Sequence, residues 1–256
     1  LAIAVRERLK QAKTGSCKEP EMKAIAPTLS IQDKNSTLPE QNQFLIEKTI
    51  TKEGVNWFLF PFAGRLANEG LAALASYRMS KIIPMSLSVS FNDYGFHLCS
   101  NEDLDLGEKE WRELLNPENL IDELLDCMNL SEMAKRQFRE VARVAGLIFQ
   151  GFPGAQKSAR QVQASGGLFF DVFSKYDPEN LLLTQSRREV LERQLEVERI
   201  LSKLQEIKSQ DLIINYPGRL TPFAFPLWAE SLRTQVSTES WGDRVRKMAE
   251  ELEQNN

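Results

Sequence analysis

The chain has 256 residues, which is long enough for one large or two small domains with a packed core. Hydrophobic residues make up 42% and charged residues 27%, and 36 acidic against 32 basic side chains give a net charge of −4. These values exclude a chain that is basic throughout, so any surface for nucleic acid must be a local patch. No apolar run approaches the roughly 20 residues of a membrane span. The well-separated Cys17, Cys99 and Cys127 indicate a reducing cytoplasm rather than a disulfide framework.

His97 is the single histidine of the chain. A zinc site or a histidine-based triad would have to rest on that one side chain, which counts against both. The carboxylates show no pairing that suggests general acid–base chemistry. We therefore expect no catalytic residue, no metal site and no cofactor in this chain.

The first elements are predicted to be helical and then irregular. The opening LAIAVRERLK has the character of a helix, and it starts with Leu1 rather than methionine, so we expect a fragment of a longer protein. Gly15, Pro20 and Pro27 then predict a loop and a short apolar segment.

Two β-hairpins follow, with a helix between them. In FLIEKTITKEGVNWFLFPFAG, two runs of aromatic and β-branched residues flank a turn at Lys52–Gly54. In MSLSVSFNDYGFHLCS, apolar residues alternate with serines before a turn at Asn92–Asp93. The intervening RLANEGLAALASYRMSKII is apolar around most of a helix, which predicts a buried helix.

Helices dominate from about Leu104, including one long helix predicted across residues 180–210. DLIINYPGRLTPFAF reads as extended again and could return to the earlier sheet, and a last amphipathic helix is predicted from Ser240. Strands first and helices later predict an α+β fold. We expect an antiparallel β module of hairpins, with a barrel as one alternative, packed with a larger helical module. The β module would span about 43–100 plus 211–225, and the helical module about 104–210 plus 226–254.

The stretch GFPGAQKSAR, residues 151–160, is close to the phosphate-binding loop of nucleotide hydrolases. It fails that test because Gln156, not glycine, precedes Lys157, and because Pro153 removes an amide donor. We interpret it as a junction between two helices. The N-terminus of the second helix, with Lys157 and Arg160, could hold a backbone phosphate.

Three arginines share one face of the helix before this junction: Arg136, Arg139 and Arg143. Such a stripe is most often a solvated face, and it is less often a nucleic-acid surface. Trp57 could be a platform for base stacking, but a tryptophan in so apolar a run favours a core position. His97 is likewise better interpreted as a strand residue with satisfied ring nitrogens than as a catalyst.

Several long blocks of the chain closely resemble one family in consecutive order, from about Met22 to Glu253. They include FPFAGRLANEGLAALASYRMSK, SVSFNDYGFHL, REVARVAGLIFQGFPGAQKSARQVQASGGLFFDVFSKYDPENLLL and TPFAFPLWAESLRTQVSTESWGDRVRKM. The family is that of the bacterial Lhr-type helicases, in the form called the ligase-associated DEXH-box helicase. The resemblance covers nearly the whole chain.

This resemblance implies an ATP-dependent superfamily 2 helicase that moves 3′ to 5′ on single-stranded DNA. Such enzymes have two RecA-like motor domains, a winged helix and a large C-terminal domain. Residues 1–256 resemble that C-terminal, DEAD/H-associated domain alone. The ATP and Mg²⁺ of the parent enzyme would therefore belong to motor domains that this chain does not contain, and the fragment itself would catalyse nothing.

The resemblance also implies partners and a place of action. We expect single-stranded DNA or an RNA–DNA hybrid as ligand, contacts with the enzyme's own RecA-like and winged-helix domains, and a role in DNA repair in the bacterial cytoplasm. A DNA ligase, a nuclease or a metallophosphoesterase would be further partners. The alternative is a structural domain that braces the motor and recruits repair proteins without binding nucleic acid. The expected nucleic-acid contacts are polar or basic residues within the family blocks: Arg65, Asn92, Arg136, Arg139, Arg143, Lys157, Arg160 and Gln161.

Overall fold

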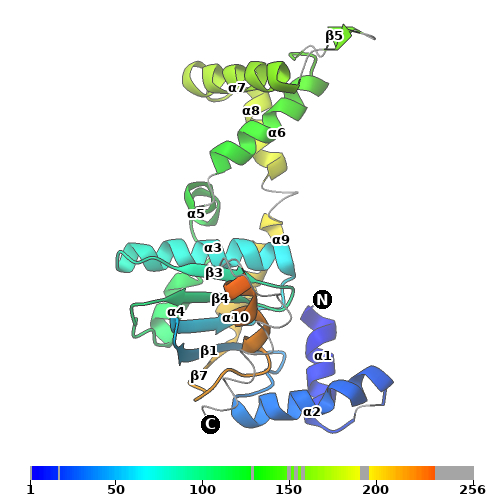
Figure 1. The fold of residues 1–256 in the computed structure, drawn as a ribbon, viewed down its shortest axis with the longest axis vertical. Coiled ribbons are helices and arrows are strands. Elements are labelled where there is room, and N and C mark those ends of the chain that lie inside the picture. Colours follow the sequence, from blue (N-terminus) through cyan, green and yellow to red (C-terminus); the bar gives the residue numbers. More distant parts are fainter. Residues whose placement is uncertain are drawn as a thin grey trace. The chain divides into compact units, whose positions relative to one another are not determined.

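The computed structural model describes most of the chain. The described ranges are residues 2–16, 18–127, 130–148, 151–152, 155–156, 159–190 and 196–233, and side chains at 125–126, 130–133, 151–152, 155–156 and 159–165 are outside the description. The chain divides into two compact units (Figure 1). The sheet unit comprises Leu1–Glu118 with Arg199–Asn256, and the helical unit comprises Asn119–Glu198. The module boundaries expected from the sequence stay a prediction.

A five-stranded sheet organises the sheet unit. Its strands are β1 (Gln43–Thr51), β2 (Gly54–Leu59), β3 (Ser88–Phe91), β4 (Phe96–Ser100) and β7 (Asp211–Asn215). They lie in the order β3-β4-β2-β1-β7, and every pairing is antiparallel except that of β7 with β1. Both predicted hairpins and the return of the late strand are confirmed. The α+β class is confirmed as well, but the barrel alternative is wrong, because β3 and β7 are the two edges of an open sheet.

One face of this sheet packs on helices from both ends of the chain. Leu45 and Phe58 belong to a core cluster with residues of α1 (Ala2–Lys13), α2 (Pro20–Asn35) and α10 (Ala224–Arg233). Burial of such aromatic and aliphatic side chains is the main stabilising contribution, at about 25 cal/mol per Å² of apolar surface. The sheet therefore fixes segments that are 200 residues apart in sequence at one place.

The helix α2 corrects the prediction of a loop and a short apolar segment. Pro20 occupies its first turn, where proline is well tolerated, but Pro27 lies inside the helix. An internal proline removes one backbone hydrogen bond. Burial of Met22 and Leu29, seven residues apart on the same helix, offsets that loss.

The buried helix predicted between the hairpins is confirmed as α3 (Arg65–Ile82), which contacts β3 and β4 (Figure 1). Gly70 of α3 faces α9 (Val197–Ser209), and a Cβ at this position would lie 2.3 Å from Cδ1 of Ile200. Only glycine allows the two helices to approach so closely. The short helix α4 (Glu108–Leu114) also contacts α3.

The helical unit has its own core. It contains α5 (Leu120–Cys127), α6 (Leu130–Val144), α7 (Ala159–Tyr176) and α8 (Leu181–Glu189). Phe138 of α6 meets Phe170 and Phe173 of α7 edge-on, with ring centroids 5.6 and 6.1 Å apart. Among the described residues, no helix is both long enough and apolar enough to cross a membrane.

Two predictions for the later part of the chain are corrected. The junction between α6 and α7 contains a short β-hairpin, β5 (Gly151–Phe152) with β6 (Ala155–Gln156), rather than a plain loop. The long helix predicted across residues 180–210 is two helices, α8 and α9, because Glu196 has a φ of 48°, which no right-handed helix contains. The last predicted helix, from Ser240, lies outside the described residues.

Candidate nucleic-acid interface

Arg65 and Asn92, two of the expected contact residues, lie together at the start of α3. The backbone N–H of Arg65 donates to Oδ1 of Asp93 at 3.2 Å, and that of Gly64 donates to the Asp93 carbonyl at 3.1 Å. Phe62, with a φ of 55°, donates its N–H to the Tyr94 carbonyl at 2.9 Å. This uncommon backbone conformation is held by the packing around it. The β3–β4 turn is therefore fastened to the first turn of α3.

The Arg65 side chain is exposed and rests on an aromatic ring. Its guanidinium carbon lies 5.1 Å from the centroid of the Phe91 ring, and Nη1 donates to the Phe91 carbonyl at 3.4 Å. Within the described ranges, no carboxylate forms an ion pair with this guanidinium. A cation over an aromatic face is stabilised without losing its charge. Arg65 therefore presents a positioned positive charge to solvent.

The two polar atoms of the Asn92 side chain differ in their hydrogen bonding. Its Oδ1 accepts the backbone N–H groups of Tyr94 at 2.8 Å and Gly95 at 3.0 Å. Its carbonyl accepts Nδ2 of Asn68 at 2.7 Å. Because Oδ1 is engaged, the amide orientation is fixed by the turn. The Nδ2 group has no hydrogen-bond partner among the described residues.

Asn92 and Tyr94 also line an apolar groove of about 490 Å³, which we name the tyrosine groove. Its walls come from α1, α2, the loop after β2, the β3–β4 turn and the start of α10. The lining side chains include Arg8, Phe60, Phe62, Asn92, Tyr94 and Phe223. Arg8 is paired with Glu19 at 2.6 Å on the surface, so its charge is largely balanced.

The arginine stripe of α6 lies in the helical unit and is not uniform. Arg136 is exposed and has no ion pair within the described residues. Arg139 is half-buried, and its alkyl chain runs so close to α7 that a Cβ on Gly166 would lie 2.4 Å from its Cγ. Arg143 is paired with Glu140 at 2.5 Å. Two of the three predicted residues therefore keep an unbalanced charge.

The remaining expected contacts are beyond what the structure describes. Lys157 lies outside the described residues. Arg160 and Gln161 belong to the first turn of α7 by their backbone, and their side chains are outside the description. Arg65 and Asn92 thus form one group and the α6 arginines another, each in its own unit.

Trp57 and His97 are interior residues, as the sequence favoured. Trp57 is 1% exposed, which is incompatible with a platform for base stacking. His97 is fully buried, with Nε2 2.8 Å from Oδ1 of Asn56 and Nδ1 3.2 Å from Oγ of Ser90. Burial lowers the pKa of His97 to about 3, so the ring is neutral at physiological pH.

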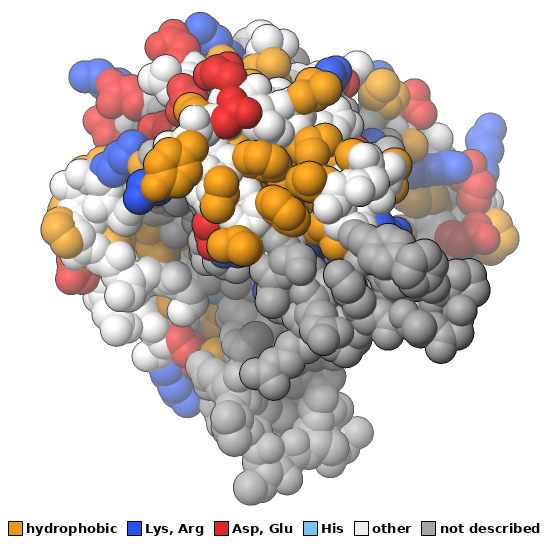
Figure 2. Space-filling model, turned by 90° about the horizontal axis from the view of Figure 1, so that it is seen from above, with side chains coloured by type: hydrophobic (Ala, Val, Ile, Leu, Met, Phe, Trp, Pro, Cys, Tyr) orange, Lys and Arg blue, Asp and Glu red, His pale blue; other side chains and the backbone are white. Residues whose placement is uncertain are grey.

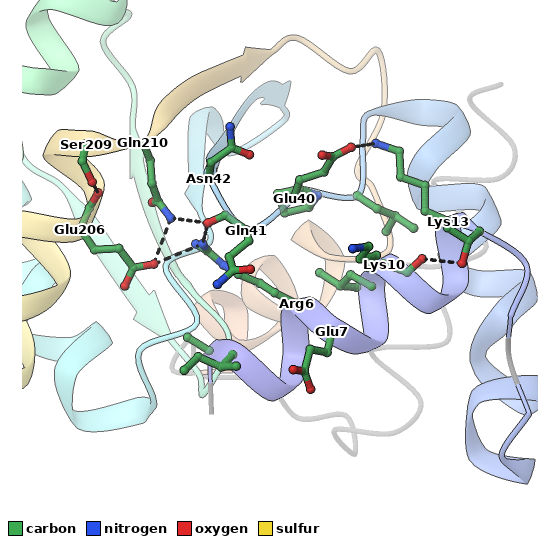
Figure 3. A pocket seen from close by; sticks show the side chains of 16 residues that line it. Arg6, Glu7, Lys10, Lys13, Glu40, Gln41, Asn42, Glu206, Ser209 and Gln210 are labelled. Carbon is green, nitrogen blue, oxygen red and sulfur yellow. Dashed lines mark hydrogen bonds and ion pairs between the residues drawn. The ribbon is translucent and has the colours of Figure 1, made fainter.

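A second cleft, which the sequence did not indicate, lies between α1, residues 38–42 and the end of α9 (Figure 3). Its volume is about 850 Å³. Buried Arg6 donates to the Gln41 carbonyl and pairs with Oε1 of Glu206 at 3.2 Å, while Gln210 donates to the same Oε1 at 2.9 Å. Basic and acidic side chains are balanced along its wall: Arg6, Lys10 and Lys13 against Glu7, Glu40 and Glu206. The cleft therefore has no net attraction for an anion.

Across the described residues, no three His, Cys, Asp or Glu side chains gather in a way that could hold a metal ion. The free thiol of Cys99 lies at the sheet, where burial raises its pKa.

Comparison with known proteins identifies the class of this α+β chain. The chain belongs to the family described as DEAD/H associated, whose model matches residues 38–224. This result confirms the family resemblance seen in the sequence blocks. The DEAD/H-associated domain is a part of the Lhr helicases, to which this chain is related.

Two archaeal helicases are similar to this chain in sequence. ATP-dependent helicase Lhr-Core protein 2 of Thermococcus barophilus is 29% identical over 212 residues, which are 82% of this chain and 24% of the relative. ATP-dependent helicase Lhr-Core of Methanocaldococcus jannaschii is 29% identical over 235 residues, which are 91% of this chain and 27% of the relative. The chain thus spans about a quarter of the length of these relatives. The ligase-associated form and the bacterial origin stay predictions.

A solved structure shares the fold. The helicase Lhr of Mycobacterium smegmatis bound to ssDNA and AMP-PNP superimposes with a TM-score of 0.62 at 17% identity, over 80% of this chain and 27% of that chain. At this identity, the likeness concerns the fold alone.

Proposed function

We propose that this chain is the nucleic-acid-binding accessory domain of an ATP-dependent Lhr-type DNA helicase that moves 3′ to 5′ and acts in DNA repair. The domain guides a strand through contacts to its phosphates and catalyses nothing itself. ATP and Mg²⁺ act in the motor domains of the whole enzyme. The family match and the helicase relatives support the parent enzyme, and the surface around Arg65 supports the role of the domain.

Arg65 carries this proposal. A guanidinium is suited to phosphate because its planar N–H groups match the phosphate oxygens. The ring of Phe91 and the fastened β3–β4 turn hold it in place, so little conformational freedom is lost when a strand binds.

The end of α3 beside Arg65 is a weaker phosphate site than the side chain. The carboxylate of Asp93 already accepts the first backbone N–H of this helix, and its negative charge repels a phosphate there. The contact we propose is therefore between the Arg65 guanidinium and one phosphate, without any reading of base sequence.

The test is a titration of the 256-residue chain with fluorescent single-stranded DNA across a salt series. Each phosphate contact on a single strand contributes about −0.7 to the slope of log affinity against log salt. We expect Arg65→Gln to weaken binding about 3- to 10-fold at low salt and to reduce the slope by about 0.7.

Arg219→Gln is the matched control. Arg219 is an exposed arginine of the same unit, and its Nη2 donates to Oδ1 of Asn35 at 3.4 Å. Its replacement removes the same charge, so it should change the affinity far less than Arg65→Gln. If both variants lose the same affinity, the loss is explained by the change in net charge, which would contradict a specific contact at Arg65.

A structural domain that recruits partners is the second candidate. On α7, Leu168, Val172 and Tyr176 are exposed at intervals of four residues, so they form an apolar stripe on one side of the helix. Figure 2 shows hydrophobic side chains gathered on the face nearest the viewer. Such a stripe fits contact with another protein surface.

The same titration separates the two candidates. A bracing domain predicts no binding of single-stranded DNA at any salt concentration. A strand guide predicts binding that falls steeply as salt rises.

A further inference from the structure

The tyrosine groove offers an exposed aromatic face that the fold does not use. The side chain of Tyr94 is 53% exposed, although neighbouring Phe60 and Phe62 are buried in the core. Its backbone is fixed on both sides, because its N–H donates to Asn92 Oδ1 and its carbonyl accepts the Phe62 N–H. A half-exposed ring on a fixed backbone, at the edge of an apolar groove, is a surface on which a flat apolar group can stack.

Asn92 lines the same groove. Its Oδ1 is engaged by the turn, and its Nδ2 lacks a partner among the described residues. The groove thus combines an exposed aromatic ring, the Asn92 amide, the Arg8 guanidinium paired with Glu19 and an apolar wall that includes Phe223. A ligand that fits must be flat, largely apolar on its faces and able to accept a hydrogen bond at its edge.

Arg65 is bonded to the turn that carries Asn92 and Tyr94. Its backbone N–H donates to Oδ1 of Asp93, and its Nη1 donates to the Phe91 carbonyl. A ligand with an anionic group next to its flat ring would therefore meet Arg65 with that group. Nucleotides of a single strand have this arrangement, with a base on one side and a phosphate on the other.

We propose that the tyrosine groove receives one unstacked nucleobase of a single strand, with its face on Tyr94 and its edge at Asn92 Nδ2. This inference rests on the proposed function, because it places the base of the nucleotide whose phosphate lies at Arg65. The groove volume of about 490 Å³ is within the range of small-ligand sites. A paired base cannot turn its face to Tyr94, so the groove selects a single strand over an RNA–DNA hybrid.

The test compares two oligonucleotides of equal length and charge, oligothymidylate and an abasic strand with the same sugar-phosphate backbone. We expect the 256-residue chain to bind oligothymidylate at least about fivefold more tightly, since base–aromatic stacking strengthens binding by that order. Tyr94→Ala should bind both strands equally and as weakly as the wild-type chain binds the abasic strand. Tyr94→Phe, which keeps the ring, should behave like the wild-type chain.

Tyr216→Ala is the control for loss of an exposed ring. Tyr216 is 64% exposed in the same unit and does not line the groove. It should leave the ratio between the two oligonucleotides unchanged. A thermal unfolding curve for each variant shows that it is folded at the temperature of the titration.

A measurement on the unaltered chain guards against a variant that fails to fold. A strand with one 2-aminopurine should change its fluorescence on binding, because stacking on an aromatic ring quenches that base. Equal affinity for the thymidylate and abasic strands, or no change in 2-aminopurine emission, would overturn the base site while leaving the phosphate contact at Arg65 standing. Failure of both strands to bind would overturn the proposed function as well.

Discussion

Two regions of the sheet unit differ in how they use their polar side chains. On the inner face of the sheet, the Glu47 carboxylate accepts hydrogen bonds from Gln32 at 2.8 Å and Thr221 at 2.6 Å, and His97 lies between Asn56 and Ser90. At the rim, Arg65 has no ion pair and Asn92 Nδ2 has no hydrogen-bond partner among the described residues. Polar side chains thus form hydrogen bonds within the protein in the first region, whereas in the second region some of their donors have no partner among the described residues.

The difference teaches how a functional residue can be told from a structural one in this protein. A buried polar group without a partner inside the molecule costs about 1–3 kcal/mol, because it has also lost its hydrogen bonds to water. A polar group at the rim of the sheet can form hydrogen bonds with water and therefore has no such penalty. A donor there that has no partner in the protein, and whose position is fixed, is available to a ligand. Substitutions in the two regions should therefore separate stability from binding.

The largest expected effect is on stability, from Trp57→Ala in the interior. The Trp57 ring is 1% exposed, with Nζ of Lys48 5.8 Å from its centroid. Loss of so large a buried side chain should lower the free energy of unfolding by about 3–5 kcal/mol, as measured by chemical denaturation. The affinity for single-stranded DNA of the fraction that remains folded should not change.

Trp57→Phe is the control for this prediction. It keeps most of the buried ring and removes Nε1, which has no hydrogen-bond partner within the described residues. We expect a clearly smaller loss of stability than with alanine. If a Trp57 variant is stably folded but no longer binds single-stranded DNA, Trp57 contributes to DNA binding and the prediction is wrong.

An intermediate effect is expected from the titration of His97. Its pKa is about 3 in the folded protein because of burial, against an ordinary value of about 6.5. The folded state therefore binds fewer protons than the unfolded state between these values, so stability falls as pH falls from about 6.5 towards 3. The slope should reach at most about 1.4 kcal/mol per pH unit.

Glu47 has the opposite effect on how stability depends on pH, and it provides the control. Burial raises the pKa of Glu47, although hydrogen bonds from Thr221, Ser36 and Gln32 oppose this rise. Its cost to stability therefore appears as pH rises from about 4.3 through the raised value. His97→Gln should flatten the acid limb of the stability curve, and Glu47→Gln should steepen it. An acid limb that is the same in His97→Gln and the unaltered chain would contradict a neutral buried histidine.

The sequence was sufficient for elements whose pattern is local. Alternation with serines up to Phe91, followed by the turn at Asn92, predicted the hairpin of β3 and β4, and apolarity around most of the helix predicted the buried α3. It failed where tertiary contacts decide. Pro27 is helical because Met22 and Leu29 of the same helix are buried, and the positive φ of Glu196 divides a pattern that reads as one helix.

The candidate site was predicted in part for the same reason. Arg65 and Asn92 were expected as separate polar residues of the family blocks, but no local pattern showed that the turn is fastened to α3. Tyr94 was missed, because its function depends on a groove completed by Arg8 and Phe223, which lie about 86 and 129 residues away in the chain. The residue types are visible in the sequence, whereas their juxtaposition follows from the sheet order.

The smallest expected effect lies in the helical unit, where the α6 arginines repeat the contrast between balanced and unbalanced charge. Arg143 is paired with Glu140, whereas Arg136 and Arg139 have no ion pair within the described residues. If α6 contacts the strand, Arg136→Gln and Arg139→Gln should each weaken single-stranded DNA binding by about twofold and lower the salt slope. Arg143→Gln should change both less, because Glu140 already offsets the charge of Arg143. If all three variants weaken binding equally, α6 acts only through its total charge. If none of them changes binding, the stripe is a solvated face and the strand contact is confined to the region around Arg65.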